Sequence, residues 1–498
     1  MTQSTKSATD AAGGYVTDIP YLFRYHRELN PAIHALMITG EGRTPAFRPH
    51  GALTYLELGC GFGLSTLVHA AGNPAGRYIG VDFIPQHIAT AKGLAAAAGV
   101  TNVEFIELSF ADLAHHPLPD CDVIAAQGVW SWVDAANRDL IIRFVEKKLR
   151  SGGVFYVSYN ALPALAPIIP AREIMWSAFR NAAGPTSVKI DAALARVREV
   201  MAANSTYLTD NPRASQMLER ALQSSPNYLA HEYFNATWDA FYHADVANSL
   251  RPAGMSYLAS AHILSNMDRA NLTPDTEQLL AKIADRTERE TLRDYFLVPE
   301  FRRDIFVRNL APAVNMDATL FAMKFAGLAN PTDVDSIAGI TLLGEIKPPR
   351  AIAEAILRAL MRGPASADDL ANASECRGIG RAELYDVLVV LTAMGAAEPA
   401  APEATLTARK AIADRLNPVL WNYAIHGDTI SVNLSPVTGG GIAVPQVDQV
   451  FLLARYRGED PVAFLQRTFG ANVEGDLAAG YTHFLGYRLP LLQRLGIA

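Results

Sequence analysis

Cysteine is scarce in this sequence. The 498-residue chain has three, Cys60, Cys121 and Cys376, and none of them belongs to a CxxC pair. An odd number of widely spaced cysteines argues against a disulfide framework, and the lack of clustered thiols gives no zinc site, so no metal is expected. Free thiols are typical of a reducing compartment, and the sequence therefore favours a cytoplasmic protein.

Long apolar runs and an excess of positive charge are also absent. The first fourteen residues contain no apolar core of the kind that a signal peptide needs, and the apolar stretch at 161–171 is interrupted by three prolines. The sequence therefore predicts no membrane insertion. The 43 basic and 50 acidic side chains give a net charge of −7, which offers no general attraction for a phosphate backbone, so nucleic acid is not an expected partner.

Apolar material for large cores is plentiful, since half of the residues are hydrophobic, and a chain of this length predicts two or three domains. From 52 to 160, short apolar runs alternate with longer helical stretches, which is typical of a parallel sheet built from βαβ units and hence of an α/β fold. The predicted strands are 53–59, 77–82, 103–109, 121–127 and 153–159, and the predicted helices are 64–72, 85–98 and 135–149.

The rest of the chain has a different pattern. Helical spacing replaces the strand pattern between 171 and 250, and strand-like sequence returns at 254–262 and 304–308. We therefore expect a helical block inserted between the fifth and sixth strands of one sheet, lying as a cap over the carboxyl ends of the strands. Residues 350–400 read as three helices and a short strand, much like a winged helix, and 429–455 as an irregular loop followed by a helix. The predicted units are 1–50 (N-terminal helical segment or lid), 51–170 (core), 171–250 (cap), 251–315 (completion of the core sheet) and 316–498 (mainly helical C-terminal domain).

A glycine-rich turn and an acid follow the first two predicted strands. The sequence ELGCGFG at 57–63 has three glycines at alternate positions, which let the backbone turn tightly and approach a ligand without interference from a Cβ. Asp82 closes the apolar strand RYIGVD nineteen residues after Gly63, where its carboxylate can accept both hydroxyls of a ribose. Structural alternatives remain open: tight strand-to-helix turns need glycine without any ligand, and Asp82 could be the N-cap of a helix that starts near Pro85.

The GxGxG spacing, preceded by Glu57, resembles motif I of class I S-adenosylmethionine (SAM) methyltransferases rather than the GxGxxG of dinucleotide-binding folds. The resemblance implies a Rossmann-like core with a mostly parallel seven-stranded sheet, and SAM as the cofactor. It implies that Glu57 and the loop backbone hold the methionine portion, that Asp82 holds the ribose, that Phe83 packs beside the sugar and base, and that Ser109 and Phe110 flank the adenine. The full set of implied cofactor residues is Glu57, Gly59, Cys60, Gly61, Gly63, Asp82, Phe83, Ser109, Phe110, Gln127, Gly128 and Tyr21.

A longer resemblance covers most of the chain. QGVWSWV at 127–133 and SYNALPA at 158–164 are similar to HGVYSWV and SYNALPG in a bacterial group whose methyltransferase core carries a methyltransferase regulatory domain. Its best-known members are the rickettsial lysine methyltransferases that modify outer-membrane proteins. Gln127 in place of the histidine removes an acid/base side chain at the end of strand 4. Further similar segments are 15–31, 229–246, 289–308 and 433–442.

This resemblance implies transfer of a methyl group to a lysine amine. Methyl transfer from a sulfonium is an in-line displacement, so the enzyme aligns the nucleophile and excludes water. A lysine, whose free pKa is about 10.4, must first lose a proton, and a desolvated aromatic pocket favours the neutral amine. The side chains expected around this pocket are Trp130, Trp132, Tyr159, Asn160, His231, Glu232 and Tyr233, of which Tyr159, Asn160, Trp132 and His231 are the predicted catalytic residues.

These pocket residues also have structural interpretations. Trp130 and Trp132 fit a plain core, and Asn160 fits a turn before a proline. His231 and Glu232 fit a solvated helix face. The sequence alone does not decide between the two sets of interpretations.

Two other segments have open roles. Tyr15 and Tyr21 fit either a lid over the cofactor or ordinary packing. The run Arg302-Arg303-Asp304 is expected to form a surface ion pair or to start a strand.

The function that the sequence favours is a protein lysine N-methyltransferase. A C-terminal unit at 316–498, which methyl transfer itself does not need, favours recruitment of a polypeptide with accessible lysines by that unit and the cap. The alternatives are a small-molecule N- or O-methyltransferase, in which the cap closes over a metabolite, and a SAM-binding interaction protein without enzymatic activity. The oligomeric state does not follow from the sequence.

Overall fold

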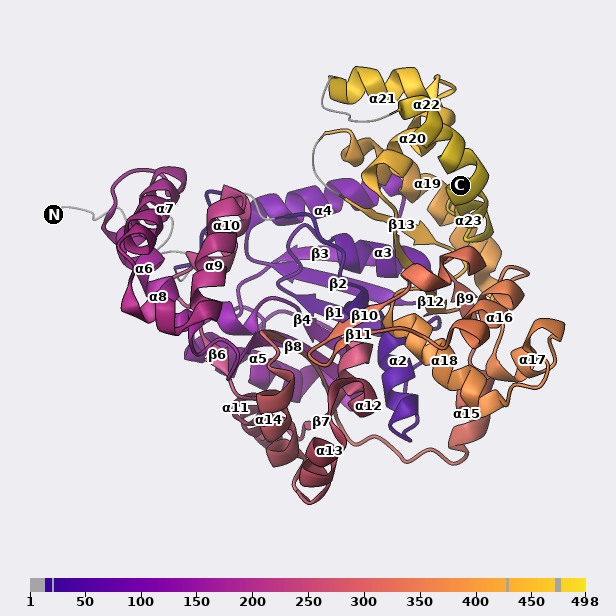
Figure 1. The fold of residues 1–498 in the computed structure, drawn as a ribbon, viewed down its shortest axis with the longest axis horizontal. Helices are drawn as coiled ribbons and strands as arrows, with labels where there is room; N and C mark the ends of the chain where they lie inside the picture. The colour runs from indigo at the N-terminus through magenta and orange to yellow at the C-terminus, as the bar shows by residue number, and fades with distance from the viewer. Residues whose placement is uncertain (1–13, 20–21, 427–429, 471–475) are drawn as a thin grey trace.

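A mostly parallel sheet forms the centre of the computed structural model, which describes residues 14–19, 22–426, 430–470 and 476–498. The strand order is β3-β2-β1-β4-β5-β8-β7, with β1 to β5 parallel and β8 antiparallel to both of its neighbours (Figure 1). The short strand β6 pairs with β5. This order confirms the predicted Rossmann-like α/β core. The strands are β1 (Thr54–Leu58), β2 (Arg77–Asp82), β3 (Val103–Glu107), β4 (Cys121–Ala126), β5 (Leu149–Ala161), β6 (Ala240–Phe241), β7 (Ser256–Ser260) and β8 (Phe301–Val307).

The sheet is covered on both faces, because successive strand residues point to opposite sides. On one face of the sheet, Tyr55 of β1 packs into a hydrophobic core that the strands form with helices. On the other face, Leu56 and Leu58 pack into a second hydrophobic core. The first face is covered by α2 (Pro31–Gly40), α3 (Leu64–Gly72) and α4 (Pro85–Ala98), and the second by α5 (Ala135–Lys148) and α11 (His243–Leu250). Strand β2 and helices α3 and α4 have the predicted bounds.

Strand β5 is longer than the predicted 153–159. Gly152 and Gly153 resemble a turn in the sequence, yet the Gly152 N–H donates to Arg308 O (2.5 Å) and Gly153 O accepts from the Arg308 N–H (3.1 Å). The pairing of β5 with β4 shifts register between Cys121 and Val123, which accommodates the extra residues as a bulge.

A helical bundle lies between β5 and β6 in the sequence and to one side of the sheet (Figure 1). Its helix α9 buries residues at helical spacing, Ala214, Met217, Leu218 and Ala221, against a core that the bundle forms with its own helices. This bundle is the inserted helical cap of the predicted fold. Its helices are α6 (Ile168–Asn181), α7 (Thr186–Ala202), α8 (Thr206–Asp210), α9 (Pro212–Gln223) and α10 (Pro226–Tyr233).

Buried charges hold the last part of the sheet together. Arg302 of β8 pairs with Asp304 (2.9 Å), with Asp294 (2.5 Å) and with Glu290 (3.3 Å), and all four side chains are nearly inaccessible to solvent. Of the two alternatives for the run Arg302-Arg303-Asp304, the start of a strand is confirmed, since β8 begins at Phe301. The surface ion pair is wrong, because α14 brings two more acids over the strand, and buried charges of this kind persist only when paired. The helices between β7 and β8 are α12 (Asp268–Asn271), α13 (Pro274–Ala281) and α14 (Arg286–Leu297).

The C-terminal part contains three helices followed by a strand, in the order that the sequence predicts. Strand β12 pairs antiparallel with β9, and Phe325 of β9 also bridges to Ala365. The elements are α15 (Met316–Ala322), β9 (Phe325–Gly327), β10 (Gly339–Thr341), β11 (Gly344–Ile346), α16 (Arg350–Leu360), α17 (Ala367–Ala371), α18 (Arg381–Ala393), β12 (Ala397–Pro399), α19 (Leu406–Ala424), β13 (Val432–Ser435), β14 (Gly440–Ala443), α20 (Gln446–Arg457), α21 (Pro461–Phe469), α22 (Leu477–His483) and α23 (Leu489–Arg494). Across the described ranges, none of the helices has both the length and the apolar character that a membrane span requires.

The segment predicted as an irregular loop is a hairpin of β13 and β14. Asn417 of α19 donates to Leu434 O (3.0 Å) and accepts from the Leu434 N–H (2.8 Å), so a side chain from a distant helix completes the hydrogen bonding of β13. The hairpin packs against α3 so closely that a Cβ on Gly72 would lie 2.0 Å from Gly439 O. The C-terminal part therefore rests directly on the helix that follows the glycine loop.

Candidate active site

The glycine loop between β1 and α3 needs its glycines for backbone geometry and for packing. Gly59, Gly61 and Gly63 have φ values of 69°, 54° and 69°, which L side chains rarely adopt. A Cβ on Gly63 would lie 2.4 Å from the Phe105 ring, and one on Gly59 would lie 2.6 Å from Val129. The loop thus leaves the first amides of α3 at the edge where the parallel strands end, which suits an anionic or polar ligand.

Asp82, at the end of β2, fixes this loop. Its carboxylate accepts hydrogen bonds from the N–H groups of Gly61 (2.9 Å) and Ile84 (2.9 Å), and the His87 ring nitrogen lies 3.3 Å away. The N-cap of α4 is Ile84, so the alternative interpretation of Asp82 as the N-cap is wrong. A carboxylate has about four acceptor positions, so a ribose bound here would use the remaining one and share or replace another.

Glu57, at the end of β1, is a buried carboxyl with one polar contact to a side chain. The Thr66 hydroxyl donates to it, and the residue is 3% exposed. Burial raises the pKa of Glu57 to about 8, the Thr66 hydrogen bond lowers it, and the charge of Asp82 raises it. A cation beside this carboxyl would favour its ionised form.

An N-terminal segment, residues 14–19 and 22–30, lies over the glycine loop. The Phe23 ring stacks on Phe62 of the loop at 4.2 Å between centroids, and the Tyr15 ring meets Phe83 edge-on at 6.0 Å. Tyr15 therefore lies against a residue predicted to pack beside the cofactor. Tyr21, the other predicted lid residue, lies outside the described residues.

The residues predicted to flank the adenine follow β3. The Ser109 hydroxyl donates to Asp112 (2.6 Å) and accepts from the Asp112 N–H (3.3 Å), so it closes a turn. Phe110 is partly buried against the second core, and Phe83 is 37% exposed. An apolar ring surface is thus available at this edge, while the Ser109 hydroxyl already has a partner.

Gln127 and Gly128 follow β4 and line a cavity. The Tyr156 hydroxyl donates to Gln127 Oε1 (2.5 Å), and the Gly128 N–H donates to Ser158 Oγ (2.8 Å). Both residues are therefore fixed by side chains of the neighbouring strand β5, which defines one wall of the cavity.

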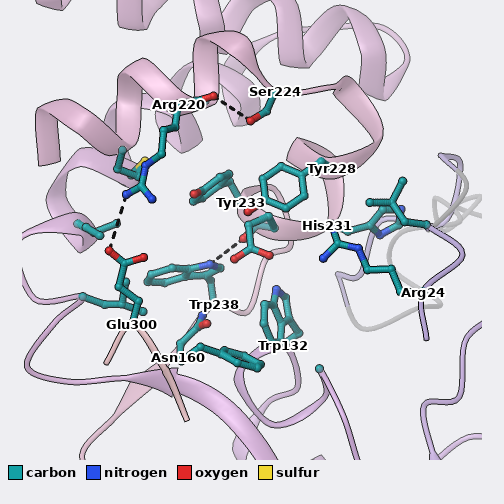
Figure 2. Close-up of a pocket in the computed structure, with 18 of the residues that line it drawn as sticks. Arg24, Trp132, Asn160, Arg220, Ser224, Tyr228, His231, Tyr233, Trp238 and Glu300 are labelled. Carbon is teal, nitrogen blue, oxygen red and sulfur yellow. Dashed lines mark hydrogen bonds and ion pairs between the residues drawn. The ribbon is translucent and has the colours of Figure 1, made fainter. Parts of the chain in front are cut away.

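The cavity has a volume of about 620 Å³ and lies between the end of the sheet, the cap and the N-terminal segment. Aromatic rings dominate its centre: Figure 2 shows Trp132 and Trp238 on one side and Tyr228 and Tyr233 on the other. Charged side chains of both signs complete the lining: Arg24, Arg220, Arg303, Glu232 and Glu300.

Asn160 and Trp132 contribute two free donors to this cavity. Asn160 is 3% exposed and its N–H donates to Ser131 Oγ (2.8 Å), whereas its side-chain Nδ2 and the Trp132 Nε1 have no hydrogen-bond partner among the described residues. Buried donors without a partner are costly, so a ligand acceptor here would be favourable. Trp130, by contrast, is 2% exposed and belongs to the core.

Tyr159 does not reach the cavity, and its predicted catalytic role needs correction. Its side chain is fully buried on the opposite face of the sheet from Asn160, since neighbouring strand residues alternate. The Tyr159 hydroxyl donates to Asp304 (2.6 Å), which also accepts from the Arg302 guanidinium and lies 3.1 Å from the His243 ring. Tyr159 is thus part of the buried charge network.

His231 and Glu232, on cap helix α10, both line the cavity. The His231 Nε2 lies 2.9 Å from Ile19 O, so this histidine holds the N-terminal segment against the cap. Burial raises the pKa of Glu232 to about 7; Arg24 lowers it and Glu300 raises it. The interpretation of these two residues as a solvated helix face does not hold, because the cavity encloses them.

Several cavity residues are missing from the sequence prediction. Tyr228, Trp238, Arg220 and Glu300 line the cavity. Trp238 and Glu300 lie within the similar segments 229–246 and 289–308 but were not singled out there, and Tyr228 and Arg220 lie outside both segments. One available signal is the four-residue spacing of Arg220, Ser224, Tyr228 and Glu232, although a break between α9 and α10 interrupts it.

Comparisons with known proteins agree with this geometry. Two family models match: the methyltransferase domain at residues 49–183 and the predicted methyltransferase regulatory domain at residues 225–308. An uncharacterized protein of Synechocystis sp. is 33% identical over 97% of this chain and 99% of its own length. An uncharacterized protein of Rickettsia prowazekii is 27% identical over 51% of this chain and 46% of its own length. PKMT2 from Rickettsia typhi, solved in complex with AdoHcy, has the same fold with a TM-score of 0.68 at 18% identity, over 96% of this chain and 99% of that one.

The fold, the loop and these matches define a SAM-dependent methyltransferase, with SAM as its cofactor. The regulatory-domain match begins in the region of α10 and extends through β8. The chain belongs to the family of methyltransferases that combine a methyltransferase domain with a methyltransferase regulatory domain.

Proposed function

We propose that this methyltransferase transfers methyl groups from SAM to lysine side chains of polypeptides. The observation that carries the proposal is the lining of the cavity, in which Trp132, Tyr233 and Trp238 form aromatic walls and Glu232 and Glu300 supply carboxylates. Aromatic faces attract both cations and apolar groups, and carboxylates attract an ammonium group. A lysine side chain combines an apolar four-carbon stem with a compact ammonium group.

For the cofactor, we propose the edge at which β1, β2 and β4 end. The buried carboxyl of Glu57 fits the amino group of the methionine portion, because a cation there offsets the burial that raises its pKa. Asp82 would accept a ribose hydroxyl, and when bound SAM supplies a methyl group on a sulfonium. The remaining proposed cofactor residues are the loop positions Gly59, Cys60, Gly61 and Gly63, the adenine neighbours Phe83, Ser109 and Phe110, and Gln127 and Gly128.

At the junction of cofactor and acceptor, we propose that Asn160 and Trp132 orient the ligands. Their two unpartnered N–H donors suit an acceptor group such as a carboxylate or carbonyl, and both line the cavity beside Gln127. The enclosing aromatic rings exclude water and align the amine, which are the main demands of an in-line methyl transfer. His231 contributes by holding the N-terminal segment in place.

We propose that two of the units predicted from the sequence, the cap at 171–250 and the C-terminal domain at 316–498, recruit the polypeptide. The N-terminal segment joins these parts: the Tyr25 hydroxyl accepts from the Gly441 N–H (2.9 Å), and Arg27 forms an ion pair with Glu398. The fold shared with PKMT2 and the resemblance to the rickettsial lysine methyltransferases support a polypeptide acceptor.

The test is incubation of the enzyme with methyl-labelled SAM and a dialysed bacterial lysate, followed by mass spectrometry of the proteins. Methyl-lysine in polypeptides is the expected result. In a parallel reaction, the small molecules removed by dialysis are added back. If the label enters only these small molecules, the acceptor is a metabolite and the lysine proposal is overturned.

A further inference from the structure

The two acids of the cavity have different surroundings. Glu300 lies 3.7 Å from the Arg220 guanidinium, as the dashed line in Figure 2 marks. Glu232 lines the same cavity, yet none of the described residues forms a hydrogen bond or an ion pair with its carboxylate. Glu232 is therefore the carboxylate with acceptor capacity to spare.

Other titratable groups face Glu232 from three elements. Arg24 comes from the N-terminal segment and lies over the Tyr228 ring at 6.0 Å. Tyr228 and Tyr233 come from its own helix, and Glu300 comes from the loop before β8. One cation and one further acid thus act on Glu232, and neither is bonded to it.

The cavity also contains the end of β4 that lies beside the cofactor edge, since Gln127 and Gly128 line it together with Glu232. An acceptor side chain that enters between the aromatic walls therefore shares the cavity with Glu232 and with the residues that follow β4. Trp238 keeps this part of the helix in position, because its Nε1–H donates to the Glu232 backbone carbonyl (2.8 Å).

We propose that Glu232 is the general base of the transfer, a role that rests on the lysine acceptor proposed above. The carboxylate accepts a proton from the lysine ammonium, so one N–H bond breaks and one O–H bond forms. The freed lone pair of nitrogen then forms the N–C bond to the methyl group. The S–C bond breaks at the same time, and the electron pair of that S–C bond remains on sulfur. The products are methyl-lysine, with its nitrogen protonated, and S-adenosylhomocysteine. The proton on Glu232 returns to solvent.

The surroundings of Glu232 suit this role. A base is most effective when its pKa lies near the operating pH, and burial raises the pKa of Glu232 to about 7. Below that pH the carboxyl is protonated and cannot accept a further proton, so the rate of methyl transfer should rise with pH through this value. Because Glu300 raises the pKa of Glu232, the substitution Glu300→Gln should move the rise to lower pH.

The test measures methyl-lysine formation in dialysed lysate protein as a function of pH from 6 to 10, at saturating SAM. Glu232→Gln should lower the rate at pH 7 by about 10²- to 10⁴-fold, and the deficit should shrink toward pH 10 as free lysine deprotonates by itself. The matched control is Glu219→Gln on α9, an exposed carboxylate outside the cavity, which should leave the profile unchanged.

Two results overturn the proposal in different ways. If Glu232→Gln binds SAM in calorimetry and gives the wild-type rate and pH profile, Glu232 is not the base while lysine methylation stands. If the wild-type enzyme forms no methyl-lysine at any pH, the proposed function fails and the base fails with it. Should Glu232→Gln not bind SAM, Glu232→Asp replaces it in the test. If the rise of the rate with pH occurs at a different pH in Glu232→Asp than in the wild type, the role is supported, and if it occurs at the same pH, the role is refuted.

Discussion

Replacement of Asp82 by alanine should weaken SAM binding strongly. Hydrogen bonds to a charged group contribute about 1.5–3 kcal/mol each. Loss of two such bonds to ribose hydroxyls costs about 3–6 kcal/mol, which corresponds to a rise in Kd of about 10²- to 10⁴-fold. The structure favours the lower part of this range, because three acceptor positions of the carboxylate are already used by Gly61, Ile84 and His87.

The same contacts predict a cost to the fold. Alanine leaves the Gly61 and Ile84 N–H groups without their acceptor, at about 1–3 kcal/mol for each group that stays buried. Asp82→Asn keeps one acceptor oxygen and the side-chain volume. The free energy of unfolding should therefore decrease in the order wild type, asparagine, alanine, and the SAM affinity should follow the same order.

The assay is titration calorimetry with SAM, together with thermal unfolding of each variant. Asp122→Ala is the matched control: Asp122 accepts from the Thr54 N–H (2.7 Å) and pairs with Arg150 (2.7 Å) at the opposite end of the strands. It should lose stability without any change in Kd. An Asp82→Ala protein that is folded and binds SAM as tightly as the wild type would refute the ribose assignment.

Three further predictions concern residues near the site. Tyr159→Phe should lose about 1–2 kcal/mol of stability, since the hydroxyl bonds to Asp304, and should change kcat less than about twofold; a large loss of kcat in a stable variant contradicts this. Glu57 has a raised pKa, so the folded ligand-free protein binds more protons than the unfolded chain, and its stability should fall as pH rises from about 4.5 to about 8. Glu57→Gln should flatten that dependence in thermal unfolding, and an unchanged slope would count against a buried protonated carboxyl. Phe23→Ala removes the ring stacked on Phe62 and should weaken SAM binding by about 2- to 10-fold in calorimetry; equal affinity would show that the segment does not cover the cofactor.

The core could be predicted from the sequence because local and global signals coincide there. Strand β2 and helices α3 and α4 have their predicted bounds, since apolar strands buried on both faces end at glycine or an acid, and helices begin directly after them. The hairpin of β13 and β14 could not be predicted in this way. Its glycines and proline resemble a loop, and the contact that completes β13 comes from Asn417 on another helix.

In the active site, too, some residues could be placed from the sequence and others could not. Motif position identifies the pair Tyr159 and Asn160, but the period of two in a strand sends one side chain into the core and the other to the cavity. A shift of one residue in register reverses that outcome, and the sequence of a strand buried on both faces does not fix it. The burial of the ion pair between Arg302 and Asp304 could not be predicted for a related reason: the further partners Asp294 and Glu290 lie on a helix that the local sequence does not place over β8.

The origin of the cavity lining explains why the cofactor could be inferred from motifs and the acceptor could not. The glycine loop, Asp82 and Gln127 belong to the methyltransferase-domain match at 49–183, and so do Trp132 and Asn160. Both acids and most of the remaining aromatic side chains of the lining lie within the regulatory-domain match at 225–308, whereas Tyr15 and His26 precede both matches. The lining residues within 225–308 include Tyr228, His231, Glu232, Tyr233, Trp238, Glu300, Phe301 and Arg303. In the proposed function, that segment supplies much of the surface that an acceptor side chain would touch. Substitutions in it should therefore change which acceptor is methylated while SAM affinity stays constant. For the same reason, a relative's acceptor can be carried over to this chain only as far as these residues agree.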